Sequence, residues 1–494
     1  MSTSTRSRAA SAFAAAAIAV LTALSFAAPA SAAPVIDPDE TGSITIHKFD
    51  RPESPTGLPN NGTEVDTTGL TPLEGITFRA RQVQGLDLST NAGLAAASDL
   101  AASFNAGDPE GSITAEGYTL SSGTTQTTGA DGEALFGGLP VGVYVVEETG
   151  YGPGITPSVP FVVTVPLTDP NSNDTWLYDV HVYPKNSTTA AEKTVTDATA
   201  RGLGDEVRFT IATDIPNESV IDGYRIVDTL DAKLDYVSTA VALESGTALA
   251  EGTDYTIGFD EATNSVRVEF TAAGRAVLAA NNSTRVIVNI ITSANAIGEI
   301  ENQAVLYPNA ASFDAAAGDP GGPVLTPTVE TRWGGMTLQK AGTGGEALTG
   351  AKFAIFTSEA DALAQTNAVS IDGVTEFEVT ATSGELTING LRYSDFANGA
   401  TVAEGDPGFI RYYLVETQSP DGYELLAQPV SFLVNAASTA TGIDMTVTNV
   451  PSNAGFQLPL TGGTGTGLLY LAGGVLVVGG AALFIVSRAR RARA

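Results

Sequence analysis

The placement of lysine is the chemically most informative feature of the sequence, because the chain has only six lysines among 494 residues. Three of them continue a strand-like alternation of apolar and polar residues: Lys48 in "ITIHK", Lys193 in "EKTV" and Lys340 in "MTLQK". Alternate side chains of a β-strand share one face of the sheet, so all three amines are predicted to point into domain cores. An isolated charged amine is costly to bury, and each one therefore needs a partner or must become neutral.

Acidic and asparagine side chains occupy apolar strand faces in the same way. Glu148, Asp228 and Glu416 each continue an alternation that begins with a tyrosine, and Asn302 and Asn449 end later apolar runs. The separation from lysine to asparagine is 109 residues in both the second and the third predicted domain (302 − 193 and 449 − 340). Each of these two domains therefore offers a lysine on its first strand, an acid on a later strand and an asparagine on its last.

Such a set of residues can form a covalent bond. Burial lowers the pKa of an amine and raises the pKa of a carboxyl group, so that both become neutral. The amine can then attack the asparagine carboxamide, while the protonated acid hydrogen-bonds the carboxamide oxygen and transfers protons. Loss of ammonia leaves a Lys–Asn isopeptide bond after a single turnover. The alternative interpretation is a Lys–acid ion pair beside an ordinary capping asparagine.

The overall composition excludes several classes of function. The chain carries 55 acidic and 24 basic residues, a net charge of −31, which repels nucleic acid and anionic lipid. It has no cysteine, which excludes disulfides, thiol catalysis and cysteine-bound metals. Its two histidines, His47 and His181, are too few for a histidine-rich metal site, and no Ser-His-Asp arrangement is visible. The acidic loops lack clean EF-hand spacing, so neither a metal nor a cofactor is predicted.

Both ends of the chain are predicted to direct its location. Residues 1–32 combine early arginines, a long apolar run and an Ala-x-Ala site, the pattern of a secretory signal peptide. Near the other end, "GLLYLAGGVLVVGGAALFIV" is long enough to span a bilayer, and the arginine-rich tail after it should stay cytoplasmic. The protein is therefore expected to be exported and held at first by its C-terminal span.

Short alternating runs with frequent turn signals predict an all-β chain of immunoglobulin-like sandwiches in an elongated series, with one short helix near residues 92–106. The boxes "LEGITF" and "DGEALFGGLPVGVYVVEETGYG" have counterparts in "LTGAKF" and "SGELTINGL" with "YYLVETQSPDGY". The first and third domains should therefore share a fold. The predicted domains are 33–187, 188–331 and 332–452, followed by residues 458–494, with linkers near 186–191 and 318–330.

Three motifs in this order give a specific resemblance. "WLYDVHVYPK" resembles a pilin motif, "YYLVETQSPDGY" an E-box and "LPLTG" a sortase signal, and with the apolar span and arginine tail they cover essentially the whole chain. The chain resembles the SpaA-type major shaft pilins of Gram-positive bacteria. The resemblance implies Cna-B-like first and third domains and a Cna-A-like middle domain. The implied sorting signal consists of Leu458, Pro459, Leu460, Thr461 and Gly462.

In that family a pilin-specific sortase cleaves between threonine and glycine, here Thr461 and Gly462, and the lysine of another subunit's pilin motif attacks the resulting thioester. The resemblance therefore implies that Lys185 becomes bonded to Thr461 of a neighbouring subunit. Pro184 cannot donate to a sheet ladder, so we predict that it ends the strand and presents Lys185 at a domain edge, outside the sheet.

The resemblance also implies internal bonds in the second and third domains, and it leaves the first domain open. Aligning "DMTVTN" on "DVHVYP" puts Pro184 where the reactive asparagine belongs, but Asn186 lies two residues further on the same face, with Lys185 pointing the opposite way. Some family members lack a first-domain bond. The implied sets are Lys340–Asn449 with Glu416, Lys193–Asn302 with Asp228 and, geometrically allowed but open, Lys48–Asn186 with Glu148.

The implied function is that of the major subunit of a covalent pilus attached to the cell wall, with a role in adhesion. The implied partners are identical subunits, pilin-specific and housekeeping sortases, peptidoglycan, minor pilins and a host surface ligand. The alternatives are a wall-anchored adhesin that never polymerises and a minor tip or base pilin. The pilin motif argues against the adhesin, because a monomeric protein needs no acceptor lysine. An exported enzyme is the weakest interpretation, since no nucleophile–base pair is visible.

Overall fold

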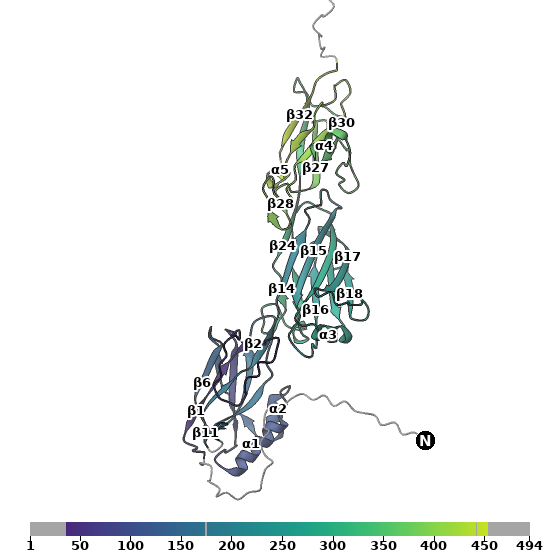
Figure 1. Ribbon diagram of the computed structural model, residues 1–494. Coiled ribbons are helices and arrows are strands. Elements are labelled where there is room, and N and C mark those ends of the chain that lie inside the picture. Colours follow the sequence, from purple (N-terminus) through teal and green to yellow (C-terminus); the bar gives the residue numbers. More distant parts are fainter. Residues whose placement is uncertain (1–35, 173–174, 441, 453–494) are drawn as a thin grey trace, which may run out of the picture.

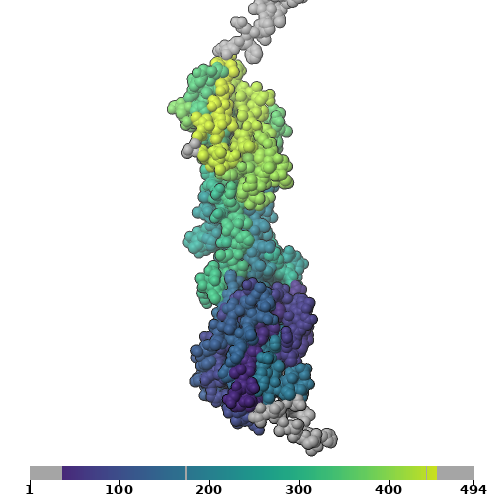
Figure 2. Space-filling view, turned by 90° about the vertical axis from the view of Figure 1, so that its left-hand side faces the viewer, coloured from purple at the N-terminus to yellow at the C-terminus, as the bar shows by residue number. Residues whose placement is uncertain are grey.

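The computed structural model describes residues 36–172, 175–440 and 442–452. Three β-sandwich domains follow one another along an elongated molecule, with the first domain at one end and the third at the other (Figure 1). The space-filling view in Figure 2 shows the same end-to-end stack. The predicted all-β fold with immunoglobulin-like domains in tandem is confirmed.

Both predicted targeting segments lie outside the described residues. They are the signal peptide, residues 1–32, and the C-terminal segment 458–494 with its sorting signal, apolar span and arginine tail. Within the part of the chain that the structure describes, no helix is long and apolar enough to cross a membrane.

The first domain packs two main sheets against each other, with strand orders β12-β1-β6 and β4-β3-β7-β9, where β5 also pairs with β3. Its core contains Ile44, Ile46, Phe78 and Phe136, all nearly inaccessible to solvent. The elements are β1 (Thr41–His47), β2 (Phe49–Asp50), β3 (Thr77–Gln84), α1 (Asn91–Ser103), α2 (Pro109–Ala115), β4 (Thr119–Leu120), β5 (Thr124–Thr127), β6 (Glu133–Pro140), β7 (Gly142–Gly150), β8 (Ile155–Thr156), β9 (Phe161–Val165), β10 (Leu167–Thr168), β11 (Trp176–Leu177), β12 (Asp179–Val182) and β13 (Lys185–Thr188).

The single helix predicted near residues 92–106 corresponds to α1, which is capped by the Thr90 hydroxyl accepting the Gly93 N–H at 3.0 Å. A second short helix, α2, follows it and was not predicted. The two helices cover a separate small core that includes Leu100, Ile113 and Val143.

The middle domain packs a four-stranded sheet, β14-β15-β20-β17, against a five-stranded sheet, β18-β19-β16-β22-β23. Alternation in β20, "RVIVNIITSA", buries every second residue, as expected for a strand with one face on the core. The elements are β14 (Ala191–Thr196), β15 (Glu206–Asp214), β16 (Arg225–Thr229), β17 (Leu234–Leu243), β18 (Tyr255–Asp260), β19 (Ser265–Phe270), α3 (Ala272–Ala279), β20 (Arg285–Ala294), β21 (Gly298–Asn302), β22 (Ala304–Tyr307), η1 (Ala311–Phe313) and β23 (Val324–Leu325).

The third domain repeats the topology of the first, as the sequence repeat predicted. In both domains the first long strand pairs antiparallel with one neighbour and parallel with a strand near the end of the domain: β1 with β6 and β12, and β24 with β27 and β32. The elements are β24 (Val329–Gly342), β25 (Lys352–Phe356), α4 (Glu359–Ala364), β26 (Phe377–Glu378), β27 (Glu385–Arg392), β28 (Phe396–Ala397), β29 (Ala400–Thr401), β30 (Tyr412–Gln418), β31 (Val430–Phe432), α5 (Ala436–Thr439) and β32 (Met445–Asn449).

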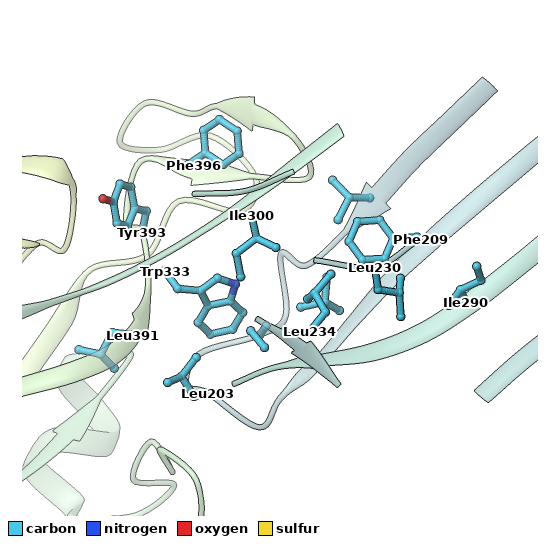
Figure 3. Packing of buried hydrophobic residues seen from close by; sticks show 14 of the residues in the cluster. Leu203, Phe209, Leu230, Leu234, Ile290, Ile300, Trp333, Leu391, Tyr393 and Phe396 are labelled. Carbon is cyan, nitrogen blue, oxygen red and sulfur yellow. The ribbon is translucent and has the colours of Figure 1, made fainter. Parts of the chain in front are cut away.

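One strand joins the middle and third domains. The first residues of β24 pair with β21 of the middle domain, and its later residues pair with β27 and β32 of the third. Trp333 of β24 is fully buried at this junction, and Figure 3 shows it among Leu203, Ile300 and Leu391, which come from both domains. The two domains therefore share a continuous apolar core.

The predicted linkers contain more regular structure than expected. Most of 186–191 lies in β13 and β14, and 318–330 includes β23 and the start of β24. Neither connection is therefore an unstructured linker, because the chain passes from sheet to sheet within two or three residues at both places.

Candidate functional site

In the third domain the strands bring the predicted lysine, acid and asparagine together. Lys340 on β24 donates a hydrogen bond from Nζ to Oδ1 of Asn449, at the end of the parallel strand β32. Glu416 on β30 comes from the opposite sheet, and its Oε1 and Oε2 accept hydrogen bonds from Asn449 Nδ2 at 2.9 and 2.8 Å. Lys340 Nζ lies 3.4 Å from Glu416 Oε1, and all three side chains are buried.

The middle domain assembles a looser set. Lys193 on β14 lies 2.6 Å from Asp228 Oδ2 on β16, and Asn302 Nδ2 at the end of β21 donates to the same oxygen at 3.4 Å. Asp228 Oδ1 and Asn302 Oδ1 are buried and have no hydrogen-bond partner among the described residues. A buried oxygen without a donor costs free energy, so this arrangement of the three side chains is destabilised at these two oxygens.

The first domain, where the sequence left the matter open, also brings its three residues together. Lys48 follows β1 and hydrogen-bonds both Glu148 on β7 and Oδ1 of Asn186 on β13. Asn186 Nδ2 donates to Glu148 Oε2 at 2.8 Å. Lys48 and Asn186 have no exposed surface, and the Glu148 side chain is 1% exposed. The first domain thus has the same set of groups in contact as the third.

Burial makes the lysines better nucleophiles. Loss of solvent lowers the pKa of Lys48 to about 8 and that of Lys193 to about 8, although the neighbouring carboxylates act in the opposite direction. Burial likewise lowers the pKa of Lys340 and raises that of Asp228. An amine with a pKa of about 8 is neutral in roughly one molecule in ten at pH 7, against roughly one in three thousand for an ordinary lysine.

The acids lie on a different side of the carboxamide from the one that the sequence suggested. The expectation was a hydrogen bond from a protonated acid to the carboxamide oxygen. In all three sets the carboxyl group instead accepts a hydrogen bond from Nδ2 of the asparagine, as Glu416 does from Asn449. The acid is therefore placed between the amine and the departing nitrogen, where it can take a proton from one and give it to the other.

Lys185 lies in a strand, contrary to the prediction that Pro184 would free it from the sheet. The ladder ends at Val182 but resumes at Lys185, whose backbone pairs with Phe49 of β2. The reason is that Pro184 lacks only an N–H group, and its carbonyl oxygen still accepts the Phe49 N–H at 3.3 Å. The proline interrupts the strand rather than ending it.

The side chain of Lys185 nevertheless points away from that of Asn186, as alternation predicted. Asn186 is buried in the first domain, whereas Lys185 is half-buried and lines a groove of about 580 Å³ between the first and middle domains. Its Nζ donates to the Tyr183 carbonyl at 3.3 Å. Burial, and after it the charge of Arg51, lowers the pKa of Lys185. The groove also contains the apolar side chains of Val159 and Val220.

Sequence reasoning missed one residue of the first-domain site. Ser158 donates its backbone N–H to Asn186 Oδ1 at 2.7 Å and its hydroxyl to Glu148 Oε1 at 2.5 Å. It lies outside any strand, so no alternation pattern points to it. The sequence feature that could have indicated Ser158 is its position ten residues after Glu148. In the third domain Leu426 lies the same distance after Glu416 and also contacts the acid.

The residues of the predicted sorting signal, Leu458 to Gly462, lie outside the described part of the chain. The described part ends at Ser452, at the far end of the third domain and at the opposite end of the molecule from the first (Figure 1).

Comparison with known proteins gives the family. The Gram-positive pilin subunit D1, N-terminal domain, matches residues 39–187, the Sgo0707 N2 domain matches residues 187–315, and the SpaA prealbumin-like fold domain matches residues 334–449. Fimbrial subunit type 1 of Actinomyces viscosus is 33% identical over 515 residues, covering 94% of each chain. Fimbrial subunit type 2 of Actinomyces naeslundii is 32% identical and covers 92% of this chain and 91% of its own.

Solved structures agree with this. The full-length major pilin SpaD of Corynebacterium diphtheriae has a TM-score of 0.67 at 26% identity, covering 84% of this chain and 98% of its own. The major pilin SpaA of the same organism has a TM-score of 0.59 at 25% identity, covering 83% and 100%. The chain belongs to the SpaA-type major pilins of Gram-positive bacteria, and it is a structural subunit of a cell-surface pilus rather than a catalyst.

Proposed function

We propose that the subunits form a covalent head-to-tail polymer through Lys185 and Thr461. A pilin-specific sortase cleaves the bond between Thr461 and Gly462, so that the glycine amine leaves and the threonine carbonyl is held as a thioester on the sortase cysteine. The neutral Nζ of Lys185 in the next subunit attacks this carbonyl, the thiolate leaves, and an amide joins the two subunits.

The observation that carries this proposal is the contrast between Lys185 and the three core lysines. Lys48, Lys193 and Lys340 are buried beside an acid and an asparagine, whereas Lys185 faces a groove with no carboxylate hydrogen-bonded to it among the described residues. Its lowered pKa increases the neutral fraction that can attack a thioester. An apolar segment such as "LPLT" could reach it along the groove, where Val159 and Val220 are exposed.

Three internal isopeptide bonds complete the proposal: Lys340–Asn449, Lys193–Asn302 and Lys48–Asn186. The contacts within each set and the lowered lysine pKa values support these bonds. Tension enters a subunit at Lys185 and leaves at Thr461. In the middle and third domains a bond between lysine and asparagine carries this load past most of the sandwich, which stays folded.

The segments at the two ends of the chain provide export and anchoring in this proposal. The signal peptide directs export, and the C-terminal apolar span retains the subunit in the membrane until a sortase cleaves it. A housekeeping sortase then attaches the finished polymer to peptidoglycan. Minor pilins and a host surface ligand are the further partners proposed for the adhesive pilus.

A lysine-to-arginine exchange tests the linkage. Lys185→Arg keeps a positive charge but cannot form the amide, so it should abolish the ladder of SDS-resistant polymers and leave anchored monomers. Lys233→Arg is the matched control, because Lys233 is also half-exposed and bonds only a backbone carbonyl, that of Glu299, among the hydrogen bonds described. A ladder that persists in Lys185→Arg would refute the assignment of Lys185, because another amine would then join the subunits. A wild-type chain that forms no ladder would instead favour the non-polymerising, wall-anchored adhesin.

A further inference from the structure

Ser158 contacts all three members of the first-domain set. Its backbone N–H donates to Asn186 Oδ1 at 2.7 Å and, more weakly, to Glu148 Oε1 at 3.3 Å. Its hydroxyl donates to Glu148 Oε1 at 2.5 Å and accepts from Lys48 Nζ at 3.3 Å. A single residue in a loop thus touches the nucleophile, the acid and the carboxamide.

The third domain offers a direct comparison. Leu426 lies ten residues after Glu416, just as Ser158 lies ten residues after Glu148. The N–H of Leu426 donates to Glu416 Oε2 at 2.8 Å, and no backbone N–H reaches Asn449 Oδ1 among the hydrogen bonds described. Its apolar side chain cannot bond the acid. The two donors of Ser158 are therefore a property of the first domain and not of the shared fold.

We propose that Ser158 is a catalytic residue of the first-domain reaction, through its N–H, and also positions the acid through its hydroxyl. This inference rests on the proposed Lys48–Asn186 bond. When neutral Lys48 Nζ attacks Asn186 Cγ, the new C–N bond moves an electron pair onto Oδ1, where the Ser158 N–H stabilises the developing negative charge.

The proton balance closes on Glu148. Its carboxylate takes one proton from the attacking nitrogen, and the same proton then passes to Asn186 Nδ2, which already hydrogen-bonds Glu148 Oε2. The Cγ–Nδ2 bond then breaks and ammonia leaves, without any oxidant or further reactant. The Ser158 hydroxyl holds Oε1 in this orientation, so that the two oxygens face the two nitrogens.

The test measures the rate of cross-linking in the full chain. Newly synthesised, pulse-labelled protein is digested at successive times, and the branched peptide containing Lys48 and Asn186 is quantified by mass spectrometry. Ser158→Ala keeps the N–H but loses the hydroxyl, and it should slow cross-linking about tenfold or more, as expected for a hydrogen bond to a charged group. Ser158→Thr keeps the hydroxyl and should restore the rate to within about threefold of the wild type, which a merely structural role would not require.

Ser158→Pro removes the N–H as well and should slow cross-linking by roughly a hundredfold or more, the usual loss for one oxyanion donor. Pro157 lies immediately before the position and Pro160 two residues after it, so the segment already contains proline on both sides. The Lys340–Asn449 peptide from the same digest is the internal control, and it should form at the wild-type rate in the Ser158 variants. Leu426→Ala is the matched variant in the third domain, and it should leave first-domain cross-linking unchanged.

The two proposals fail in different ways. A wild-type chain that never yields the Lys48–Asn186 peptide would overturn the bond, and the role of Ser158 with it. A wild-type chain that forms the bond, with Ser158→Ala and Ser158→Pro forming it at the same rate, would overturn the role of Ser158 alone.

Discussion

Replacing Glu416 by glutamine tests the chemistry of the internal bonds with the smallest change of shape. The glutamine oxygen can still accept the hydrogen bond that Asn449 Nδ2 makes to Glu416 Oε2 at 2.8 Å. The amide cannot, however, take a proton from Lys340 and pass it to the leaving nitrogen. We therefore expect Glu416→Gln to fold but to lack the third-domain bond.

The size of the effect follows from the length of chain that the bond closes. Lys340 and Asn449 are 109 residues apart, and cross-linking a loop of this length restricts the unfolded chain by about 5 kcal/mol. For a domain of this size, 5 kcal/mol corresponds to about 20 °C in the melting temperature. The variant also leaves the buried Lys340 amine without a carboxylate, which adds to the loss.

Intact mass and calorimetry of the full chain provide the readouts. The deficit from the sequence mass, calculated for each protein's own sequence, should be smaller in Glu416→Gln than in the wild type by one ammonia, about 17 Da. Glu424→Gln is the matched control, because its side chain is exposed while its backbone carbonyl still accepts from Asn449 Nδ2 at 2.9 Å. If Glu416→Gln lost the same ammonia as the wild type or melted at the same temperature, the assigned role of the acid would be wrong.

Three further predictions follow from the same geometry. The mature wild-type chain should be lighter than its sequence mass by three ammonias, about 51 Da, and a deficit of only two would show that one of the three bonds does not form. In the Asn302→Ala variant Lys193 remains an unmodified amine. Its pKa of about 8 in the folded state lies below the ordinary lysine value of 10.5, so between pH 8 and 10.5 the unfolded chain binds more protons than the folded chain. The free energy of unfolding of Asn302→Ala should therefore rise by up to about 3 kcal/mol as the pH increases from 8 to 10.5. Wild type, in which the proposed bond makes Lys193 an amide, should lack this rise in denaturant titrations. An equal rise in both proteins would contradict the assignment. When linked polymers are pulled by force spectroscopy, Asn302→Ala should release about 360–390 Å of chain per middle domain, since the 109 residues from Lys193 to Asn302 extend by about 3.3–3.6 Å each. Lys48→Ala should add no such step, and a step of that length in wild type would argue against the middle-domain bond.

Alternation along the strands was enough to predict much of the site. Lys48, Lys193 and Lys340 lie in cores because their strands each have one apolar face, and a period of two residues fixes which face a side chain shares. The same period put Asn186 inward and Lys185 outward. The shared topology of the first and third domains followed from their repeated boxes.

The contacts that alternation could not predict depend on loops and on strand pairing between domains. Ser158 reaches the first-domain site from a loop, where no periodicity fixes the direction of a side chain. The continuation of the sheet past Pro184 depends on pairing with β2, which a single strand's sequence does not specify. Likewise, β24 is one continuous strand, and only its two sets of partners reveal that it belongs to two domains.

The position of Lys185 gives the proposed first-domain bond a different purpose from the other two proposed bonds. A load that enters at Lys185 passes through residues 186–190 into β14, so the covalent path from Lys185 to Thr461 does not include residues 36–184. A Lys48–Asn186 bond therefore cannot shield the first domain from tension, because that domain carries none along the chain. Asn186 is instead the immediate neighbour of Lys185 in β13, and a bond from Asn186 to Lys48 would fix the strand that presents the proposed linking amine. The bond would thus hold the attachment point of each subunit against the first domain, while the bonds in the middle and third domains carry the load.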